Sequence, residues 1–204
     1  MDLNPKGSAF YPDLVKALVS RYKFQEFPSS PADFDEAKGV RFALGKLGDS
    51  AIDQVVIYAY GIVLDTRAST AESRRLLEDA LRWAAKELGL VYEASMIKRW
   101  QYASQVTFYS NVGLGTDCRA FRNLAENVQK SVQDVMREKL SYELTGLLVD
   151  YDQLERKHPL GRFSIQRRDN TPFSENKYFS EAPLPTDVHL RILEQFENEL
   201  SQKA

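Results

Sequence analysis

Three strand-like segments follow one another between residues 40 and 64, with no helix-length segment between them. From Val40 to Gly45, apolar residues alternate with polar or small ones, which is the period of a half-buried strand. The apolar run from Val55 to Leu64 is interrupted by Gly61, and we expect two strands joined by a tight turn in which this glycine supplies a positive φ. Neighbouring strands with such short connections pair antiparallel.

Four segments show helical periodicity. The clearest runs from Thr70 to Leu88: Ser69 and Glu72 have the spacing of a capping box, and Gly89 follows the last helical residue. The other three helices are expected to begin near Pro12, after Thr116 or Asp117, and near Thr186 or Asp187. The third has its apolar residues at Phe121, Leu124, Val128, Val132 and Val135.

The remaining strands are expected at Tyr102 to Ser110, Leu144 to Tyr151 and Phe163 to Arg167. The predicted order is therefore α-β-β-β-α-β-α-β-β-α. This order is typical of an α+β fold, with a single mostly antiparallel twisted sheet and helices packed against it. Because no linker divides the chain, we expect one domain over residues 1–204.

Residues 169–185 show no periodicity and are expected to form an irregular aromatic strap before the C-terminal helix. Aromatic rings are costly to leave in water, so this strap should pack over its own core or clasp a second subunit or partner protein. The interface candidates are its three rings, Phe173, Tyr178 and Phe179.

The charge balance and cysteine content exclude several classes of protein. The chain has 27 Lys and Arg against 29 Asp and Glu, and a net charge of -2 gives no long-range field that would attract nucleic acid. Cys118 is the only thiol, which rules out an intrachain disulfide and a cysteine-rich zinc site. No apolar run is long enough to cross a bilayer, and residues 1–10 do not resemble a secretory signal. We expect a cytoplasmic protein without contact to a membrane.

Histidine and cysteine offer little for catalysis. His158 follows Asp152 and Glu155 in what we interpret as a solvated loop, and His189 is expected at the surface or boundary of the last helix. Cys118, at a helix start without a neighbouring base, is expected to be a small buried or boundary thiol. We therefore expect no metal and no cofactor, and the sequence favours a protein that is not an enzyme.

Two further sets of residues are candidates for ligand binding. The loop and helix start from Gly113 to Arg119 resemble in outline an anion site, with Gly113, Gly115, Thr116 and Arg119 as its candidates, although neither known glycine-rich phosphate motif is present. A plain turn with a helix cap explains them more simply. The second candidate is a basic face that would bind phosphate or RNA, formed by Arg162, Arg167 and Arg168. A solvated surface is the simpler explanation of these residues.

The leading functional hypothesis is a non-catalytic binding or assembly protein that self-associates or belongs to a multi-protein complex. One alternative is a phosphate-ligand-binding protein or enzyme that uses the Gly113 to Arg119 junction. The other is an RNA-contacting accessory factor, for which nucleic-acid binding is not favoured by the net charge.

Overall fold

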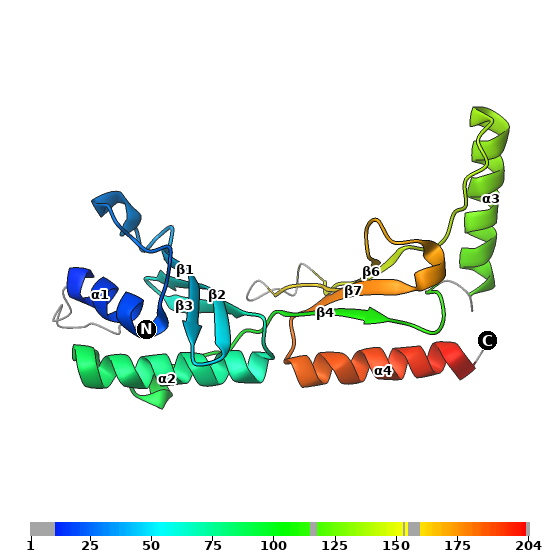
Figure 1. Cartoon of the computed structure of the whole chain (residues 1–204). Helices are drawn as coiled ribbons and strands as arrows, with labels where there is room; N and C mark the ends of the chain where they lie inside the picture. The colour runs from blue at the N-terminus through cyan, green and yellow to red at the C-terminus, as the bar shows by residue number, and fades with distance from the viewer. Residues whose placement is uncertain (1–10, 115–117, 153, 155–159, 203–204) are drawn as a thin grey trace. The chain divides into compact units, whose positions relative to one another are not determined.

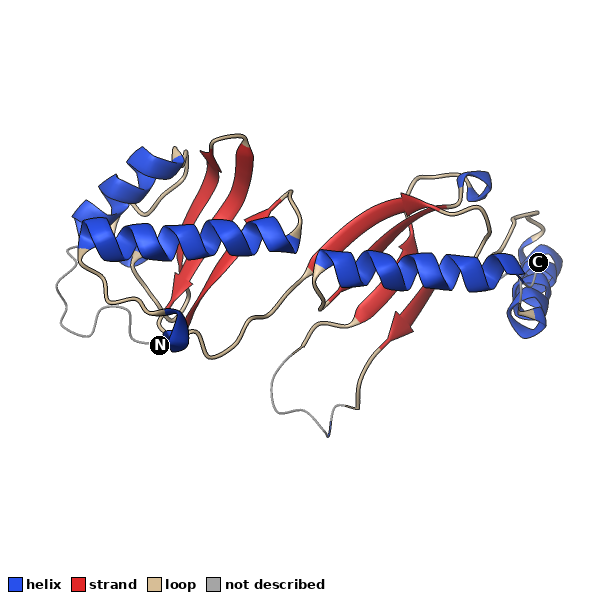
Figure 2. Cartoon of the chain, turned by 90° about the horizontal axis from the view of Figure 1, so that it is seen from below, coloured by secondary structure: helices blue, strands red, loops and turns tan. Residues whose placement is uncertain are grey.

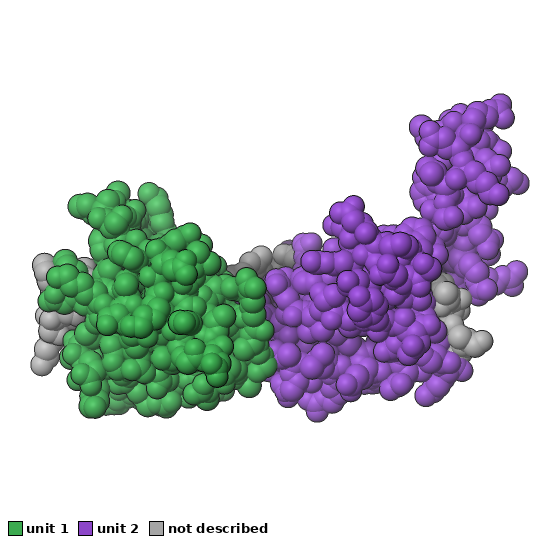
Figure 3. Space-filling view, viewed as in Figure 1, with its two compact units in different colours: residues 1–100 green, residues 101–204 purple. Residues whose placement is uncertain are grey.

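The computed structural model describes residues 11–114, 118–152, 154 and 160–202 (Figure 1). Its contacts divide the chain into two compact units, Met1–Trp100 (unit 1) and Gln101–Ala204 (unit 2), coloured separately in Figure 3. Each unit has its own antiparallel sheet and helices, so the α+β class is confirmed. The prediction of a single sheet is wrong, because no strand pairing joins the two sheets among the described residues. The assignment of residues 1–204 to one domain stays a prediction.

Unit 1 is a three-stranded meander with two helices (Figure 2). Its elements are α1 (Tyr11–Tyr22), β1 (Val40–Leu47), β2 (Ser50–Tyr58), β3 (Gly61–Thr66) and α2 (Thr70–Leu88), with short 3-10 turns at Pro31–Asp33 and Ala94–Met96. The sheet order is β1-β2-β3 and both pairings are antiparallel, as expected.

The turn between β2 and β3 differs in one respect from the prediction. Tyr58 pairs with Gly61, so Ala59 and Tyr60 form the turn and Gly61 is the first residue of β3. In the turn between β1 and β2, by contrast, Gly48 does have a positive φ of +58°.

One apolar cluster holds unit 1 together. Its buried members come from α1, β1, β2 and the segment after α1, with Phe42 at its centre and fully buried. Helix α2 begins where Ser69 Oγ accepts a hydrogen bond from Glu72 N, and it ends at Gly89, which is left-handed at φ 66°. Its Ala80 and Trp83 pack against the same cluster as Val15 of α1, so both helices cover one face of the sheet.

Unit 2 is a four-stranded antiparallel sheet whose strands are widely separated in the sequence. Its elements are β4 (Ser104–Tyr109), α3 (Arg119–Met136), β5 (Gly146–Val149), β6 (Phe163–Arg167), a 3-10 turn (Phe173–Glu175), β7 (Lys177–Ala182) and α4 (Thr186–Gln202). The sheet order is β4-β7-β6-β5, so β7, the last of the described strands in sequence, lies between β4 and β6.

Strand β7 overturns the prediction of an irregular strap over residues 169–185. Its burial alternates strictly, and Tyr178, Ser180 and Ala182 all face the core. A serine and an alanine at inward positions hide the apolar alternation that normally indicates a strand. Helix α4 packs on this inward face, where Leu193 joins Ile165 and Tyr178 in the core of unit 2.

Candidate functional site

Helix α3 carries an apolar stripe that no described residue buries. Of its 18 residues none is buried, although its hydrophobic residues repeat at helical spacing. Phe121 is 42% exposed, Leu124 59% and Val135 81%. We call the stripe the α3 seam; its members are Phe121, Leu124, Val128, Val132 and Val135.

Helix α3 ends at a left-handed residue, and a hydrogen bond connects the helix to the segment that follows. The helix ends at Arg137, which is left-handed at φ 60° and donates its backbone N–H to Gln133 O at 3.0 Å. The following segment folds back toward the helix, where Tyr142 N donates to Gln129 Oε1 at 3.4 Å. Leu140 of this segment is 47% exposed.

The charges of α3 lie away from the seam. At 100° per residue, Lys130 lies opposite the centre of the seam, and Glu126 and Asp134 lie on the same far side. The neighbours of the seam are Ala125, Gln129 and Ser131, all uncharged. The stripe is therefore narrow and apolar with a neutral border, which is the pattern of a helix–helix contact.

The three arginines of the predicted basic face do not lie together. Arg167 points to the same side of β6 as Ile165, two residues earlier, and is buried. Arg168 is exposed on the other face of the sheet, where the centre of its guanidinium lies 5.7 Å from the centroid of the Phe179 ring. Arg162 is exposed and pairs with Asp150 at 2.7 Å. The prediction that Arg167 belongs to an exposed basic face is thus wrong. Side chains along a strand alternate between its two faces, and this alternation directs the Arg167 side chain inward.

Arg167 instead organises the end of the unit 2 core. Its guanidinium donates to the carbonyl of Phe173 at 2.8 Å, to Glu143 Oε2 at 2.9 Å and to the Tyr178 hydroxyl at 3.2 Å. It also stacks over the rings of Phe173 and Tyr178, at 4.8 and 5.1 Å. These bonds hold the chain before and after the Phe173–Glu175 turn against β6.

The three rings proposed as interface residues lie in different places. Tyr178 is fully buried, and its hydroxyl also accepts a hydrogen bond from Leu114 N at 3.3 Å. Phe173 is half-buried beneath Arg167, and Phe179 is half-buried on the outer face of the sheet. Tyr178 therefore covers the core of its own unit, and only Phe179 belongs to the outer face.

The predicted anion site falls partly outside the described residues, which exclude Gly115 and Thr116. Gly113 precedes the buried Leu114, and Arg119 is an exposed residue in the first turn of α3. Cys118 precedes this helix and is exposed, which corrects its expected place as a buried or boundary thiol. His158 also lies outside the described residues.

His189 is fully buried, which corrects its expected surface position. Its Nε2 lies 2.8 Å from Ser180 Oγ, and its Nδ1 lies 3.0 Å from Ser104 Oγ. Ser180 Oγ donates to Ser164 O at 2.8 Å, and Ser104 Oγ donates to Thr186 Oγ1 at 3.3 Å, so both serines are also bonded beyond the ring. Desolvation by burial lowers the pKa of His189 below the ordinary value of 6.5.

The serine–histidine arrangement lies inside the packed core of unit 2, where Ser104, Ser180 and His189 are all buried. Both hydroxyls and both ring nitrogens are used in bonds that join α4 to β4 and β7, and Phe163 closes the site with its ring edge-on to the imidazole at 5.6 Å. Within the described ranges, no cluster of three or more His, Cys, Asp or Glu residues has the arrangement of a metal site.

We compared the chain with known protein families, with curated proteins and with solved structures, and no match was found. Among the described helices, none combines the length and the apolar content that a bilayer crossing requires.

Proposed function

We propose that this is an assembly protein that self-associates through the α3 seam, with α3 of one copy packed antiparallel against α3 of a second. The observation that carries the proposal is an 18-residue helix with a continuous apolar stripe and no buried residue. This keeps the leading hypothesis of the sequence but moves the contact from the aromatic rings of residues 169–185 to α3.

Burial of the exposed seam against a partner is energetically favourable. Most of the stability of a helix in a protein comes from packing of its apolar face, because helix formation alone is only marginally favourable in water. Leu124 and Val135 are more than half exposed, and each apolar side chain of this size gains about 1.5–3 kcal/mol on full burial. A partner that covers the seam therefore stabilises both the complex and the helix.

The spacing of the seam favours another copy of the same helix as the partner. Steps of three, four, four and three residues connect Phe121 to Val135, close to the 3.5-residue repeat of a two-helix contact. Such a pair buries the same surface on both copies, as two-fold dimers do. The helix is about 27 Å long at 1.5 Å per residue.

The helix dipoles favour the antiparallel orientation. An antiparallel pair places the partially positive N-terminus of one helix beside the partially negative C-terminus of the other. A parallel pair would place like dipole ends together. The charged residues Glu126, Lys130 and Asp134 lie away from the seam and do not decide the orientation.

The oligomeric state of matched variants tests the proposal. In sedimentation equilibrium between about 1 and 100 μM, we expect the native chain to form a dimer and Val128→Glu to be a monomer. Asn123→Glu introduces the same charge on the opposite side of α3 and should remain dimeric. Because α3 has no buried residue, neither substitution changes the core of unit 2, and the near-UV circular dichroism of both variants should match that of the native chain.

Cys118 reports on the orientation. In an antiparallel pair centred on Val128, the two Cys118 residues lie at opposite ends, about 30 Å apart along the helix axis, so mild oxidation should not cross-link the native dimer. In a Cys118→Ser background, Val128→Cys should cross-link readily. A native chain that stays monomeric at 100 μM, or a Val128→Glu variant that stays dimeric, would overturn the proposal; rapid cross-linking through Cys118 would overturn its orientation.

A further inference from the structure

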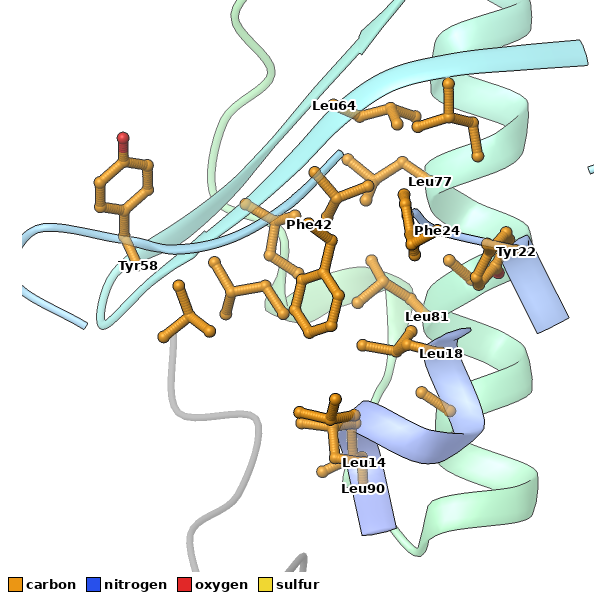
Figure 4. Close-up of a pocket in the computed structure, with 18 of the residues that line it drawn as sticks. Leu14, Leu18, Tyr22, Phe24, Phe42, Tyr58, Leu64, Leu77, Leu81 and Leu90 are labelled. Atoms are coloured by element: carbon orange, nitrogen blue, oxygen red, sulfur yellow. The ribbon is translucent and has the colours of Figure 1, made fainter. Parts of the chain in front are cut away.

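Unit 1 contains a partly open apolar cavity of about 200 Å³ between its two helices and its sheet (Figure 4). Leu14 and Leu18 reach it from α1, Phe42 from β1 and Leu64 from β3, while Leu77 and Leu81 reach it from α2. Its walls thus come from every main element of the unit, and most of them belong to or contact the buried cluster around Phe42.

Polar groups in the wall are few. Among the described residues, the lining holds no Lys, Arg or His; Glu36 is its only charged side chain and Tyr58 lies at one end (Figure 4). The Tyr22 hydroxyl is already used, because it accepts a hydrogen bond from Arg21 Nε at 3.2 Å. Ala59, which is exposed, also lines the cavity, and its backbone N–H donates to Glu36 O at 3.3 Å. This end of the cavity therefore reaches the surface beside the β2–β3 turn.

We propose that this cavity is a binding site for a neutral, compact, apolar small molecule of about the size of one substituted aromatic ring. A cavity of about 150 Å³ lined by Leu, Ile and Phe stays dry and takes up benzene, so this somewhat larger apolar cavity has room for a single substituted ring. The site is independent of the self-association of α3.

The lining also determines which ligands are rejected. A carboxylate or phosphate would lose its hydration without a cation to receive it, and at the open end it would approach the negatively charged Glu36. Fatty acids and other anions are therefore poor ligands. A neutral ring makes van der Waals contacts with wall atoms that otherwise face empty space. It also has no polar group whose hydration would be lost on entering the cavity.

Toluene and benzoate form a matched pair of probes, because the two share one ring and differ in a methyl group against a carboxylate. We expect toluene to bind the full chain with a dissociation constant on the order of 0.1–1 mM and to raise its thermal midpoint. Benzoate at the same concentration should leave the midpoint unchanged. In methyl NMR spectra, toluene should shift the resonances of Leu18, Leu77 and Leu81 but not that of Leu193, which lies in the core of unit 2.

A filled cavity provides the second test. Ala80 lines the cavity, whereas Ala71 is an exposed residue of the same helix outside it. Ala80→Phe should abolish the methyl shifts caused by toluene, and Ala71→Phe should leave them intact. The NMR experiment on the native chain decides the matter even where Ala80→Phe fails to fold.

Three results would overturn the inference. The first is the absence of methyl shifts around the cavity in toluene-saturated buffer, and the second is equal binding of benzoate. The third is a clear gain in toluene affinity when residues 1–10 are deleted, which would mean that this segment of the chain occupies the cavity. We expect the deletion to leave the toluene affinity unchanged.

Discussion

His189 Nε2 and Ser180 Oγ, nine residues apart in the sequence, are hydrogen-bonded at 2.8 Å and connect helix α4 to the strand beneath it. Ser104 completes the arrangement from β4 at 3.0 Å from Nδ1. The ring is fully buried and lies at the point where α4, β4 and β7 meet.

The burial of His189 predicts a pH dependence of stability. Its pKa is lowered in the folded chain by desolvation, so the unfolded chain binds the proton more readily between the folded pKa and about 6.5. The free energy of unfolding should therefore be constant above about pH 7 and fall as the pH drops below 6.5. Urea titrations at pH 7.5 and 5.5 measure this loss.

Two substitutions assign that pH dependence. His189→Gln should remove it, and at pH 7.5 should cost about 1–3 kcal/mol because the geometry around Ser104 and Ser180 is disturbed. His158→Gln changes the only other histidine and should retain the full dependence. Equal slopes in the native chain and His189→Gln would contradict the assignment.

Arg167 and Arg168 are expected to differ sharply in their effect on stability. Arg167→Met keeps the aliphatic stem but removes the bonds to Glu143, Phe173 and Tyr178, and should lower the free energy of unfolding by about 2–3 kcal/mol. Arg168→Met changes an exposed side chain on the other face, with an expected effect within about 0.5 kcal/mol. Denaturant titration of both variants is the measurement, and similar losses would show that Arg167 is not the anchor described above.

Two glycines in the unit 1 sheet differ in the space beside them. A Cβ at Gly45 would lie 2.5 Å from ring carbons of Phe24 and 3.0 Å from the carbonyl oxygen of Tyr22, whereas a Cβ at Gly61 would meet no atom within 4 Å. Gly45→Ala should therefore cost about 1–3 kcal/mol, because Phe24 is buried and packed against Phe42. Gly61→Ala should be neutral or slightly stabilising. Thermal denaturation of the two variants compares them directly.

The cap of α2 predicts a smaller effect. Ser69→Ala removes the acceptor of the Glu72 N–H and should cost about 1 kcal/mol. Ser69→Asp keeps an acceptor at that position and places a negative charge at the helix N-terminus, so it should retain the native stability. A loss of stability in Ser69→Asp equal to that in Ser69→Ala would show that the cap bond contributes little.

The elements that the sequence predicts well are those determined by nearby residues. Helix α2 has its predicted bounds because Ser69 and Gly89 mark both ends within the segment itself. Strand β7 was missed because its inward residues include Ser180, whose place in the core depends on His189 and Ser164 from other elements. No local pattern contains that partnership.

At the candidate site, too, some features follow from the local sequence and others only from the tertiary structure. The period of β6 could have separated Arg167 from Arg168, since neighbouring residues of a strand point to opposite faces. The apolar positions of α3 were predicted, but their exposure was not, because only the tertiary structure shows which apolar stripes find a partner in the same chain. The cavity of unit 1 results from how side chains of five elements meet, and a sequence pattern does not contain that information.

The position of β7 has a consequence for synthesis on the ribosome. Residue 104 of β4 pairs with residue 182, so β4 emerges some 70 residues before its neighbour in the sheet exists. Until residues 177–182 have been translated, the hydrogen-bonding edges of β4 and β6 lack the strand that separates them, and such edges are the ones that pair with other chains. Release of a truncated product that stops before residue 177 would therefore leave this half of the polypeptide open to aggregation.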